Sequence, residues 1–363
     1  MRIIAIANQK GGCGKTTTAV NLSASLAQAN RRVLLVDLDP QGHSTLGLNI
    51  KPIDLEKSMY DVLTIRDELR IPLSNILINI SPNLDLAPSN IILSAIEQEL
   101  SGKAEREEKL YKAISELWMT TSYDFVIIDC PPSLGLLTFN GLTAANEVIA
   151  TVDAGFYSIH GIGKLFEIAQ LIEEKLGHKI QIKALVTMFD TRTRFAHEVK
   201  DEINKYFNGN VYDTLINTNV RLKEASSYGQ PIITYDKRSM GATDYSNLAK
   251  EVLRSPMKDT VTTYEQKSDQ TPLGKKITSD VEFTFIDPDA KSVYIAGDFN
   301  GWKISDESRL QKVKEGEWRK VFNLESGRYQ YKYVVDGEWI TDPQNPKTEL
   351  DRSGNKNSLL EIN

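Results

Sequence analysis

The sequence is poor in cysteine and histidine, which excludes several kinds of site. It has two cysteines, Cys13 and Cys130, and four histidines in 363 residues. Two thiols provide no disulfide framework and too few thiolates for an iron–sulfur cluster, so we expect both to be reduced and to fill small buried positions. The histidines show no metal-ligand spacing. The sequence therefore indicates a protein of a reducing compartment.

Long apolar runs and an excess of positive charge are also missing. No stretch approaches the roughly 20 apolar residues that a membrane-spanning helix needs, and the chain opens at Met1 with a strand pattern rather than a signal peptide. The formal net charge of −6 argues against a globally basic nucleic-acid binder and leaves a local basic stripe as the candidate DNA surface. We expect a soluble, cytoplasmic protein that does not attach to a membrane.

The pattern of apolar residues divides the chain into parts, and a hydrophobic content of 40% is enough for two cores. Residues 1–254 alternate buried-type strands with helical patterns, which predicts a doubly wound α/β domain with a mostly parallel sheet. Residues 280–363 contain short alternating strands separated by Asn-Gly and Asp-Gly turns, which predicts a small all-β sandwich of immunoglobulin-like size. The polar segment 255–279 is predicted to be a linker.

A glycine-rich loop at residues 8–18 is the most informative motif. It follows an apolar run and precedes a good helix former, which is the strand–turn–helix context of a phosphate-binding loop. The backbone N–H groups around Gly11, Gly12 and Gly14 can converge on phosphate oxygens at the positive end of the following helix. The loop is therefore predicted to hold a nucleoside triphosphate.

The side chains of this loop extend the prediction to a metal ion. We expect Lys15 to contact the β- and γ-phosphates, Thr16 to bind Mg²⁺, and Thr17 to donate to another phosphate. Cys13 lies within the same nucleotide-binding loop. The alternative is a glycine-rich turn without a ligand, but such a turn has no need for Gly-Lys-Thr at the helix entry.

Two apolar runs end in carboxylates. Asp37 and Asp39 close the first run, and Asp129 closes the second. The ends of parallel strands face the ligand, and the alternation of side chains along a strand puts Asp37 and Asp39 on the same side. Asp129 could instead cap the next helix, but its position beside a phosphate loop favours a role at the nucleotide.

The pattern Lys-Gly-Gly-x-Gly-Lys-Thr-Thr, which begins at Lys10, resembles the deviant Walker A motif of the ParA/MinD ATPase family. The resemblance implies ATP and Mg²⁺ as cofactors and a homodimer in which Lys10 contacts the partner's nucleotide, whereas the alternative is a surface lysine. It assigns slow hydrolysis to Lys10, Lys15 and Asp39, with Asp39 positioning the attacking water. Asp37 would support the metal and the loop, and Asp129 would hold Mg²⁺ through a water.

The resemblance is specific to the ParA branch and extends to about residue 254. It places Asn219 beside the nucleotide base and implies that Arg192 and Arg221 bind DNA without sequence preference; the alternative is a solvated face of scattered charges. Asn217 and Thr218 stand where the family usually has Pro-Arg. The family also implies an adaptor protein that stimulates hydrolysis, and association with the nucleoid in the ATP state.

The C-terminal segments resemble the glycogen-binding module of the AMP-activated kinase β subunit. In that family two tryptophans stack on sugar rings, and polar side chains bond to the hydroxyls. The matching positions are Trp302, Trp339, Lys332 and Asn357, while Asn355 stands where the family has a threonine. The alternative is that the tryptophans belong to the core or to a protein interface.

Together these features predict a ParA-type ATPase that binds DNA as an ATP-sandwich dimer and positions a cargo, which is a plasmid, a chromosome or a protein assembly. The C-terminal module is predicted to bind an α-glucan such as glycogen. Two alternatives remain at this point. The protein is a carbohydrate-responsive ATPase without DNA binding, or its C-terminal sandwich is a protein adaptor.

Overall fold

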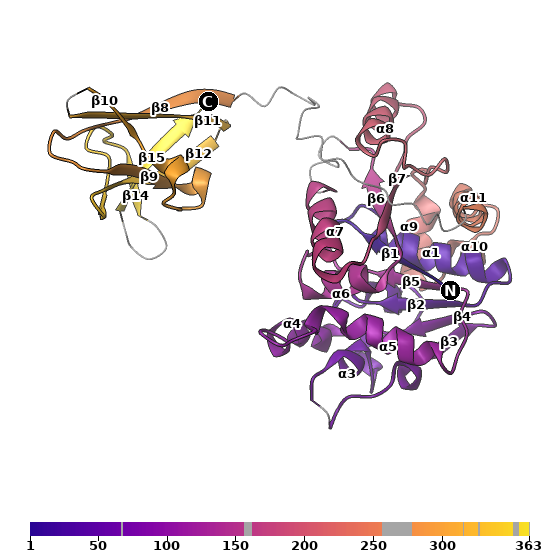
Figure 1. The fold of residues 1–363 in the computed structure, drawn as a ribbon. Helices are drawn as coiled ribbons and strands as arrows, with labels where there is room; N and C mark the ends of the chain where they lie inside the picture. The colour runs from indigo at the N-terminus through magenta and orange to yellow at the C-terminus, as the bar shows by residue number, and fades with distance from the viewer. Residues whose placement is uncertain are drawn as a thin grey trace. The chain divides into compact units, whose positions relative to one another are not determined.

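The computed structural model describes residues 1–66, 68–155, 162–255, 278–314, 316–325, 327–350 and 356–362. The chain divides into two compact units, Met1–Thr263 and Tyr264–Asn363, and each is described by itself (Figure 1). Of the predicted linker, residues 256–277 lie outside the described residues, and residues 278 and 279 belong to the first strand of the C-terminal unit.

Among the described residues, the N-terminal unit is built on a seven-stranded sheet. In spatial order its strands are β3 (Ile78–Ser81), β4 (Leu84–Ala87), β2 (Val33–Asp37), β5 (Phe125–Asp129), β1 (Arg2–Ala7), β6 (Glu147–Asp153) and β7 (Gln181–Thr187). In this sheet β3 and β4 pair antiparallel, and the other neighbours pair parallel. The predicted mostly parallel α/β fold is confirmed.

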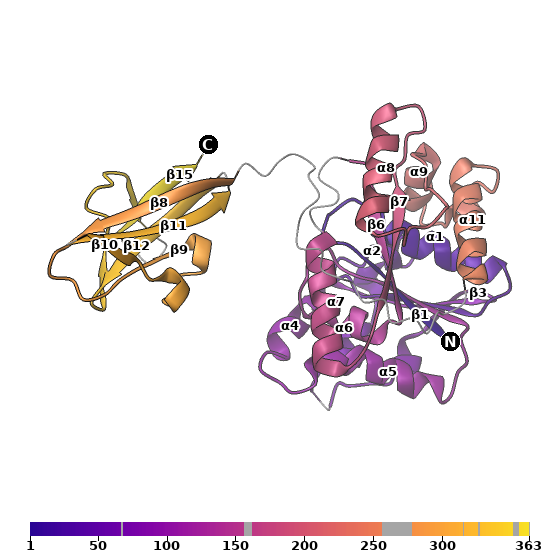
Figure 2. The same ribbon diagram turned by 45° about the horizontal axis from the view of Figure 1, so that its top comes forward.

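Helices cover both faces of this sheet (Figures 1 and 2). The α-helices are α1 (Lys15–Gln28), α2 (His43–Leu46), α3 (Met59–Leu63), α4 (Ile96–Glu99), α5 (Lys109–Trp118), α6 (Leu136–Ala144), α7 (Ile162–Leu176), α8 (Arg194–Tyr206), α9 (Val220–Ser227), α10 (Ile232–Tyr235) and α11 (Met240–Arg254). The 3₁₀ turns are η1 (Pro52–Asp54), η2 (Leu73–Ile76), η3 (Ile91–Ala95) and η4 (Arg106–Glu108). Helices α1 and α11 pack on one face, and α5, α6 and α7 lie over the other.

The apolar patterns of the sequence explain these elements. All five residues of β2 and of β5 are buried, as expected for central strands of a sheet covered on both faces. Helix α5 buries Leu110, Ala113, Ile114 and Leu117, which recur with the spacing of one helix face. The ends of β2 and β5, which carry Asp37 and Asp129, are therefore supported by a closely packed core.

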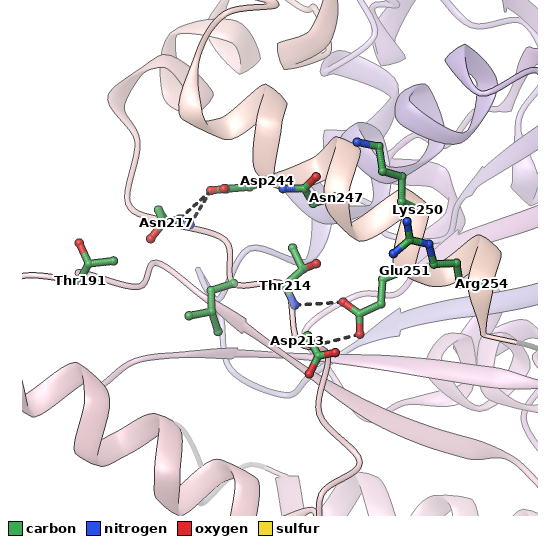
Figure 3. A pocket seen from close by; sticks show the side chains of 10 residues that line it. Thr191, Asp213, Thr214, Asn217, Asp244, Asn247, Lys250, Glu251 and Arg254 are labelled. Carbon is green, nitrogen blue, oxygen red and sulfur yellow. Dashed lines mark hydrogen bonds between the residues drawn. The ribbon is translucent and has the colours of Figure 1, made fainter.

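Helix α11 is fastened to the segment between α8 and α9. The Glu251 carboxylate accepts hydrogen bonds from the backbone N–H groups of Asp213 at 2.9 Å and Thr214 at 3.0 Å (Figure 3). Two turns away on the same helix, Asp244 accepts from the backbone N–H of Asn217 at 2.9 Å. These contacts fix residues 213–217, which lead into the segment that carries Asn219.

The C-terminal unit consists of antiparallel strands. They are β8 (Thr278–Ile286), β9 (Val293–Gly297), β10 (Gln311–Lys314), β11 (Glu317–Glu325), β12 (Gly327–Val335), β13 (Glu338–Ile340), β14 (Thr348–Leu350) and β15 (Lys356–Ile362), with 3₁₀ turns η5 (Asp298–Asn300) and η6 (Asp306–Ser308). One sheet has the order β10-β11-β8; the other has β13-β12-β15-β14, with β9 paired to β12. Its core includes Phe283, Phe285, Trp318 and Tyr333. The predicted all-β fold is confirmed.

Within the parts of the chain that the structure describes, no helix has the length and apolar character needed to cross a bilayer.

Candidate functional site

The glycine loop between β1 and α1 leaves the start of α1 open for an anion. Gly12 and Gly14 have φ values of 75° and 85°, in the left-handed region where a side chain is strained. Gly14 is the N-cap of α1, and no side chain caps the helix there. The first backbone N–H groups of α1 therefore keep their capacity to bind a phosphate oxygen.

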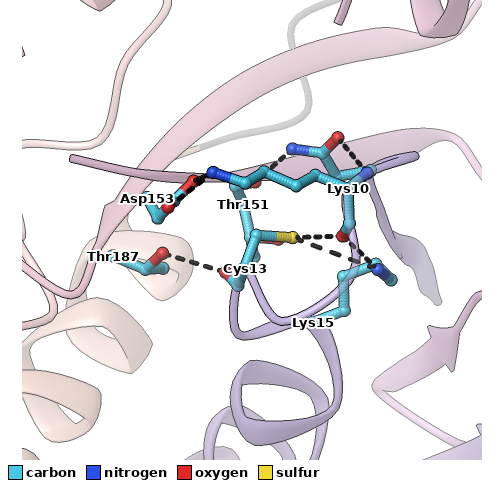
Figure 4. Close-up of polar contacts among 7 residues, drawn as sticks. Lys10, Cys13, Lys15, Thr151, Asp153 and Thr187 are labelled. Carbon is cyan, nitrogen blue, oxygen red and sulfur yellow. Dashed lines mark hydrogen bonds and ion pairs between the residues drawn. The ribbon is translucent and has the colours of Figure 1, made fainter. Parts of the chain in front are cut away.

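The two lysines of the loop point to different partners (Figure 4). Lys15 is buried, and its Nζ donates to the backbone carbonyl of Lys10 at 2.9 Å. The Nζ of Lys10 instead pairs with both carboxylate oxygens of Asp153, at 2.9 and 2.8 Å, where β6 ends. The ammonium groups of the two lysines therefore have different partners.

Residues at the ends of β6 and β7 hold the loop, and the sequence analysis did not identify them. The Cys13 Sγ lies 3.2 Å from the Thr151 hydroxyl, and the Thr187 hydroxyl donates to the Cys13 carbonyl at 2.9 Å (Figure 4). The signal that could have found them is a polar residue among the last three positions of an apolar strand. Both thiols of the chain are free and buried, as expected.

The carboxylates Asp37 and Asp129 are neighbours in the register of β2 and β5, and both are completely buried. Burial, together with the Asp129 carboxylate, raises the pKa of Asp37 to about 8, although hydrogen bonds from Thr45 oppose the shift. Burial also raises the pKa of Asp129 to about 6, against the lowering effect of the hydroxyl groups of Ser44 and Thr16. Two neighbouring carboxyl groups that are both buried from solvent favour the binding of a cation between or beside them.

The oxygens of these two carboxylates are used differently. Asp129 accepts from Ser44 Oγ at 2.8 Å through Oδ2, and among the described residues nothing donates to its buried Oδ1. Asp37 accepts from the backbone N–H of Thr45 at 2.8 Å and from that residue's hydroxyl at 2.7 Å. Asp129 therefore has an oxygen available to hold Mg²⁺ through a coordinated water, whereas Asp37 holds α2 through Thr45.

Asp39 lies two residues beyond the end of β2 and is 7% exposed. Its Oδ1 accepts from the backbone N–H of Gln41 at 2.9 Å, which closes a turn and fixes the carboxylate. Within the described residues, no three acidic, histidine or cysteine side chains form a metal-ligand cluster. A Mg²⁺ ion here would draw most of its ligands from phosphates, Thr16 and water.

The predicted base and DNA residues lie on the following elements. Asn219 is the N-cap of α9, and its side chain accepts from the backbone N–H of Arg221 at 2.8 Å. The guanidinium of Arg221 forms an ion pair with Glu224 at 2.7 Å. Arg192 is paired through two nitrogens with Asp190, at 2.9 and 2.8 Å. Both arginines are exposed, and each has a carboxylate beside it.

Two of the predicted sugar-binding residues, Trp302 and Trp339, are neighbours in the C-terminal unit. The rings of Trp302 and Trp339 have centroids 6.3 Å apart and are tilted by 35°. Neither belongs to the core cluster, which disfavours the interpretation of both as core residues. Asn357 is 3% exposed, and its amide donates to Gln330 Oε1 at 2.9 Å, so it is more enclosed than its predicted role suggests.

Lys332 and Asn355 are the remaining two predicted sugar-binding residues. Lys332 is half-buried on β12. Asn355 lies outside the described residues.

Comparison with known proteins identifies the N-terminal unit. The family described as "AAA domain" matches residues 1–182. The sporulation initiation inhibitor protein Soj of Bacillus subtilis (strain 168) is 47% identical over 252 residues, which are 69% of this chain and 98% of Soj. The chain belongs to the ParA/Soj family of ATPases. The chromosome partitioning protein ParA of Myxococcus xanthus is 42% identical, over 70% of this chain and 88% of that protein.

A solved structure supports the cofactor prediction for this ParA/Soj-family chain. Cobyrinic acid a,c-diamide synthase from Mycobacterium smegmatis, with bound ADP and magnesium, has a TM-score of 0.59 and 33% identity, covering 70% of this chain and 94% of that one. The same enzyme is also known with an ATP analogue and magnesium. The predictions of an ATPase, of ATP and of Mg²⁺ are thereby confirmed at the level of the family.

A second family covers the C-terminal unit. The family described as "Glycogen recognition site of AMP-activated protein kinase" matches residues 280–363. The ParA/Soj-family ATPase therefore carries a glycogen-recognition-like module, and both resemblances stated from the sequence are confirmed.

Proposed function

We propose that this protein is a partitioning ATPase that dimerises around ATP, binds DNA and carries a glucan-binding module. The observation that carries the proposal is the pair of separated lysines. Lys15 is buried and donates to the Lys10 carbonyl within the loop, whereas the Nζ of Lys10 lies 2.8 Å from the Asp153 carboxylate at the end of β6. Lys15 already supplies a cation to the nucleotide bound by the same chain. Lys10 is therefore better suited to contact the nucleotide of the partner subunit.

Each residue of the nucleotide site has its own proposed role in ATP hydrolysis. Lys15 and the start of α1 would bind the phosphates, and Thr16 and Asp129 would hold Mg²⁺, the latter through a water. When bound, Mg²⁺ would supply charge neutralisation at the phosphate oxygens. Asp39, fixed by its turn, orients the attacking water, and Asp37 holds α2 through Thr45. The partner subunit's Lys10 completes the site.

DNA binding is proposed for the exposed arginines. Arg192 and Arg221 stand on the loop after β7 and on α9, and dimerisation would double their number on one particle. Contacts of this kind with phosphates are independent of base sequence and weaken as salt rises. Chromosome partitioning in the named relatives makes a chromosome or plasmid the first cargo to consider.

An α-glucan is the proposed ligand of the C-terminal module. The tilted tryptophan pair, in which Trp339 is exposed and Trp302 is half-buried, offers two ring surfaces at an angle, and these fit successive sugars of a curved chain better than those of a flat one. Binding would bring a glucan-coated body within reach of the ATPase as cargo or signal.

The dimer is tested by light scattering with the Asp39→Ala variant. With ATP and Mg²⁺ this variant should be trapped as a dimer that is retained on DNA, whereas Lys15→Ala should stay monomeric because it binds no nucleotide. Lys10→Ala is the matched control, since it should bind ATP but fail to dimerise. A monomeric Asp39→Ala protein in ATP would refute the mechanism.

The alternative function, a glucan-responsive ATPase without DNA binding, is favoured by one observation, which is that each candidate arginine already has a carboxylate partner. DNA retention with ATP, with ADP and at rising salt separates the two functions. Retention that is absent with ATP at low salt would refute the partitioning role. Binding of linear and branched glucans by wild type and by Trp302→Ala/Trp339→Ala separates glucan binding from a protein adaptor.

A further inference from the structure

The backbone beneath one of the two platform tryptophans is unusual. Trp302 has a φ of 59°, and Gly301 before it has a φ of 60°. Glycine adopts this left-handed region readily, but a bulky residue does so only when its surroundings impose it. The chain therefore maintains Trp302 in an orientation that a relaxed turn would not choose.

One carboxylate accounts for much of this constraint. The indole Nε1 of Trp302 donates to Asp298 Oδ1 at 2.9 Å, and the backbone N–H of Trp302 donates to the carbonyl of Gly297 at 2.9 Å. The second oxygen of Asp298 accepts from the backbone N–H of Gln330 on β12 at 2.6 Å. Asp298 thus ties the tryptophan loop to the neighbouring strand.

The same strand residue continues the connection toward another predicted sugar contact. The amide of Asn357 on β15 donates to Gln330 Oε1 at 2.9 Å, and Gln330 Nε2 donates to Glu349 Oε2 at 2.9 Å. Trp302 and Asn357 are far apart in sequence, yet three hydrogen bonds connect them through Asp298 and Gln330. The path enters Gln330 at its backbone N–H and leaves it at the side-chain Oε1.

We propose that Asp298 is a positioning residue for α-glucan binding, which holds the indole of Trp302 in its tilted orientation toward Trp339 and fixes it relative to Asn357. The inference rests on the proposed glucan-binding function. Asp298 acts through the indole and does not contact the sugar. An aromatic ring that is fixed before binding loses less conformational freedom when the sugar arrives. Because the N–H is already paired, the ring faces remain for the C–H groups of the sugar.

The test uses the full chain and maltoheptaose, with affinity measured by calorimetry and folding measured by thermal melting. Asp298→Ala should weaken binding on the order of tenfold, because it removes a charge-assisted hydrogen bond. In a Trp302→Phe background, Asp298→Ala should weaken maltoheptaose binding by less than about twofold, because the indole N–H on which Asp298 acts is absent. Asp280→Ala, the same change on the other sheet, is the matched control and should bind as wild type.

A second pair of variants addresses the case in which Asp298→Ala melts early. Trp302→Phe keeps a ring but loses the N–H, and Trp339→Phe makes the same ring change without a described hydrogen bond to lose. Trp302→Phe should therefore weaken maltoheptaose binding several-fold more than Trp339→Phe does.

Three results would overturn the inference. They are equal losses in the two Phe variants, wild-type affinity in a folded Asp298→Ala protein, or a loss from Asp298→Ala that is undiminished in the Trp302→Phe background. Wild-type protein that does not bind maltoheptaose at all would refute glucan binding itself and this inference with it.

Discussion

Replacing Asp37 with asparagine should change how the stability of the nucleotide-free protein depends on pH. Asp37 and Asp129 are completely buried neighbours, and their pKa values are raised to about 8 and about 6, chiefly by burial. In the unfolded chain an aspartate titrates near a pKa of about 3.9. Between these values the folded state binds protons that the unfolded state has released. Stability therefore decreases as pH rises from about 4 toward 8.

The size of the effect follows from proton linkage. One additional proton on the folded state lowers the free energy of unfolding by about 1.4 kcal/mol for each pH unit. Asp37 alone would then cost about 3 kcal/mol between pH 5 and pH 7. The asparagine side chain is neutral like the protonated aspartate, so the variant should lose this slope and be the more stable protein at pH 7.

Urea unfolding at pH 5, 6 and 7, with EDTA and without nucleotide, measures the slopes. The matched control is Asp54→Asn, the same change on an exposed turn, and its slope should parallel that of wild type. If the curves of Asp37→Asn and wild type run parallel from pH 5 to pH 7, the carboxyl group is ionised in the fold and the reasoning is wrong.

Three further outcomes are expected. Arg2→Ala should destabilise the protein by about 3 kcal/mol in urea unfolding, because it leaves the enclosed Glu147 carboxylate, 2.7 Å away, without its cation; a loss below 1 kcal/mol would contradict this. Gly229→Ala should lower the melting temperature, since φ is 62° and the new methyl would lie 2.9 Å from backbone atoms of the segment after α2; an unchanged melting curve would be inconsistent. Asp190→Asn should strengthen DNA retention by freeing Arg192, whereas weaker retention would show that the carboxylate supports the arginine.

The nucleotide site was predictable where its residues are contiguous in sequence. The glycine loop, Asp37 and Asp129 form short motifs that follow apolar runs, and the parallel sheet brings their ends to one edge. Thr151 and Asp153 also lie at the end of an apolar strand, but their contacts with the glycine loop arise from the adjacency of β6 to β1, which the local pattern does not encode.

The C-terminal module shows a similar limit. The resemblance identified Trp302 and Asn357, and the turn pattern identified the strands. The enclosure of Asn357 depends on the pairing of β15 with β12, which brings its amide to Gln330.

In the N-terminal unit, the antiparallel pairing of β3 with β4 was likewise not predicted, because both strands are short and β3 is only partly buried.

The place of β1 within its sheet has a consequence for how the chain is made. The ribosome delivers β1 before its two neighbours, β5 and β6, which emerge only after residue 124 and after residue 146. Until then the nascent strand exposes unpaired backbone groups on both edges, and no folded sheet supports the glycine loop. The nucleotide site therefore assembles late in synthesis, and fragments that stop before β6 should aggregate rather than bind nucleotide.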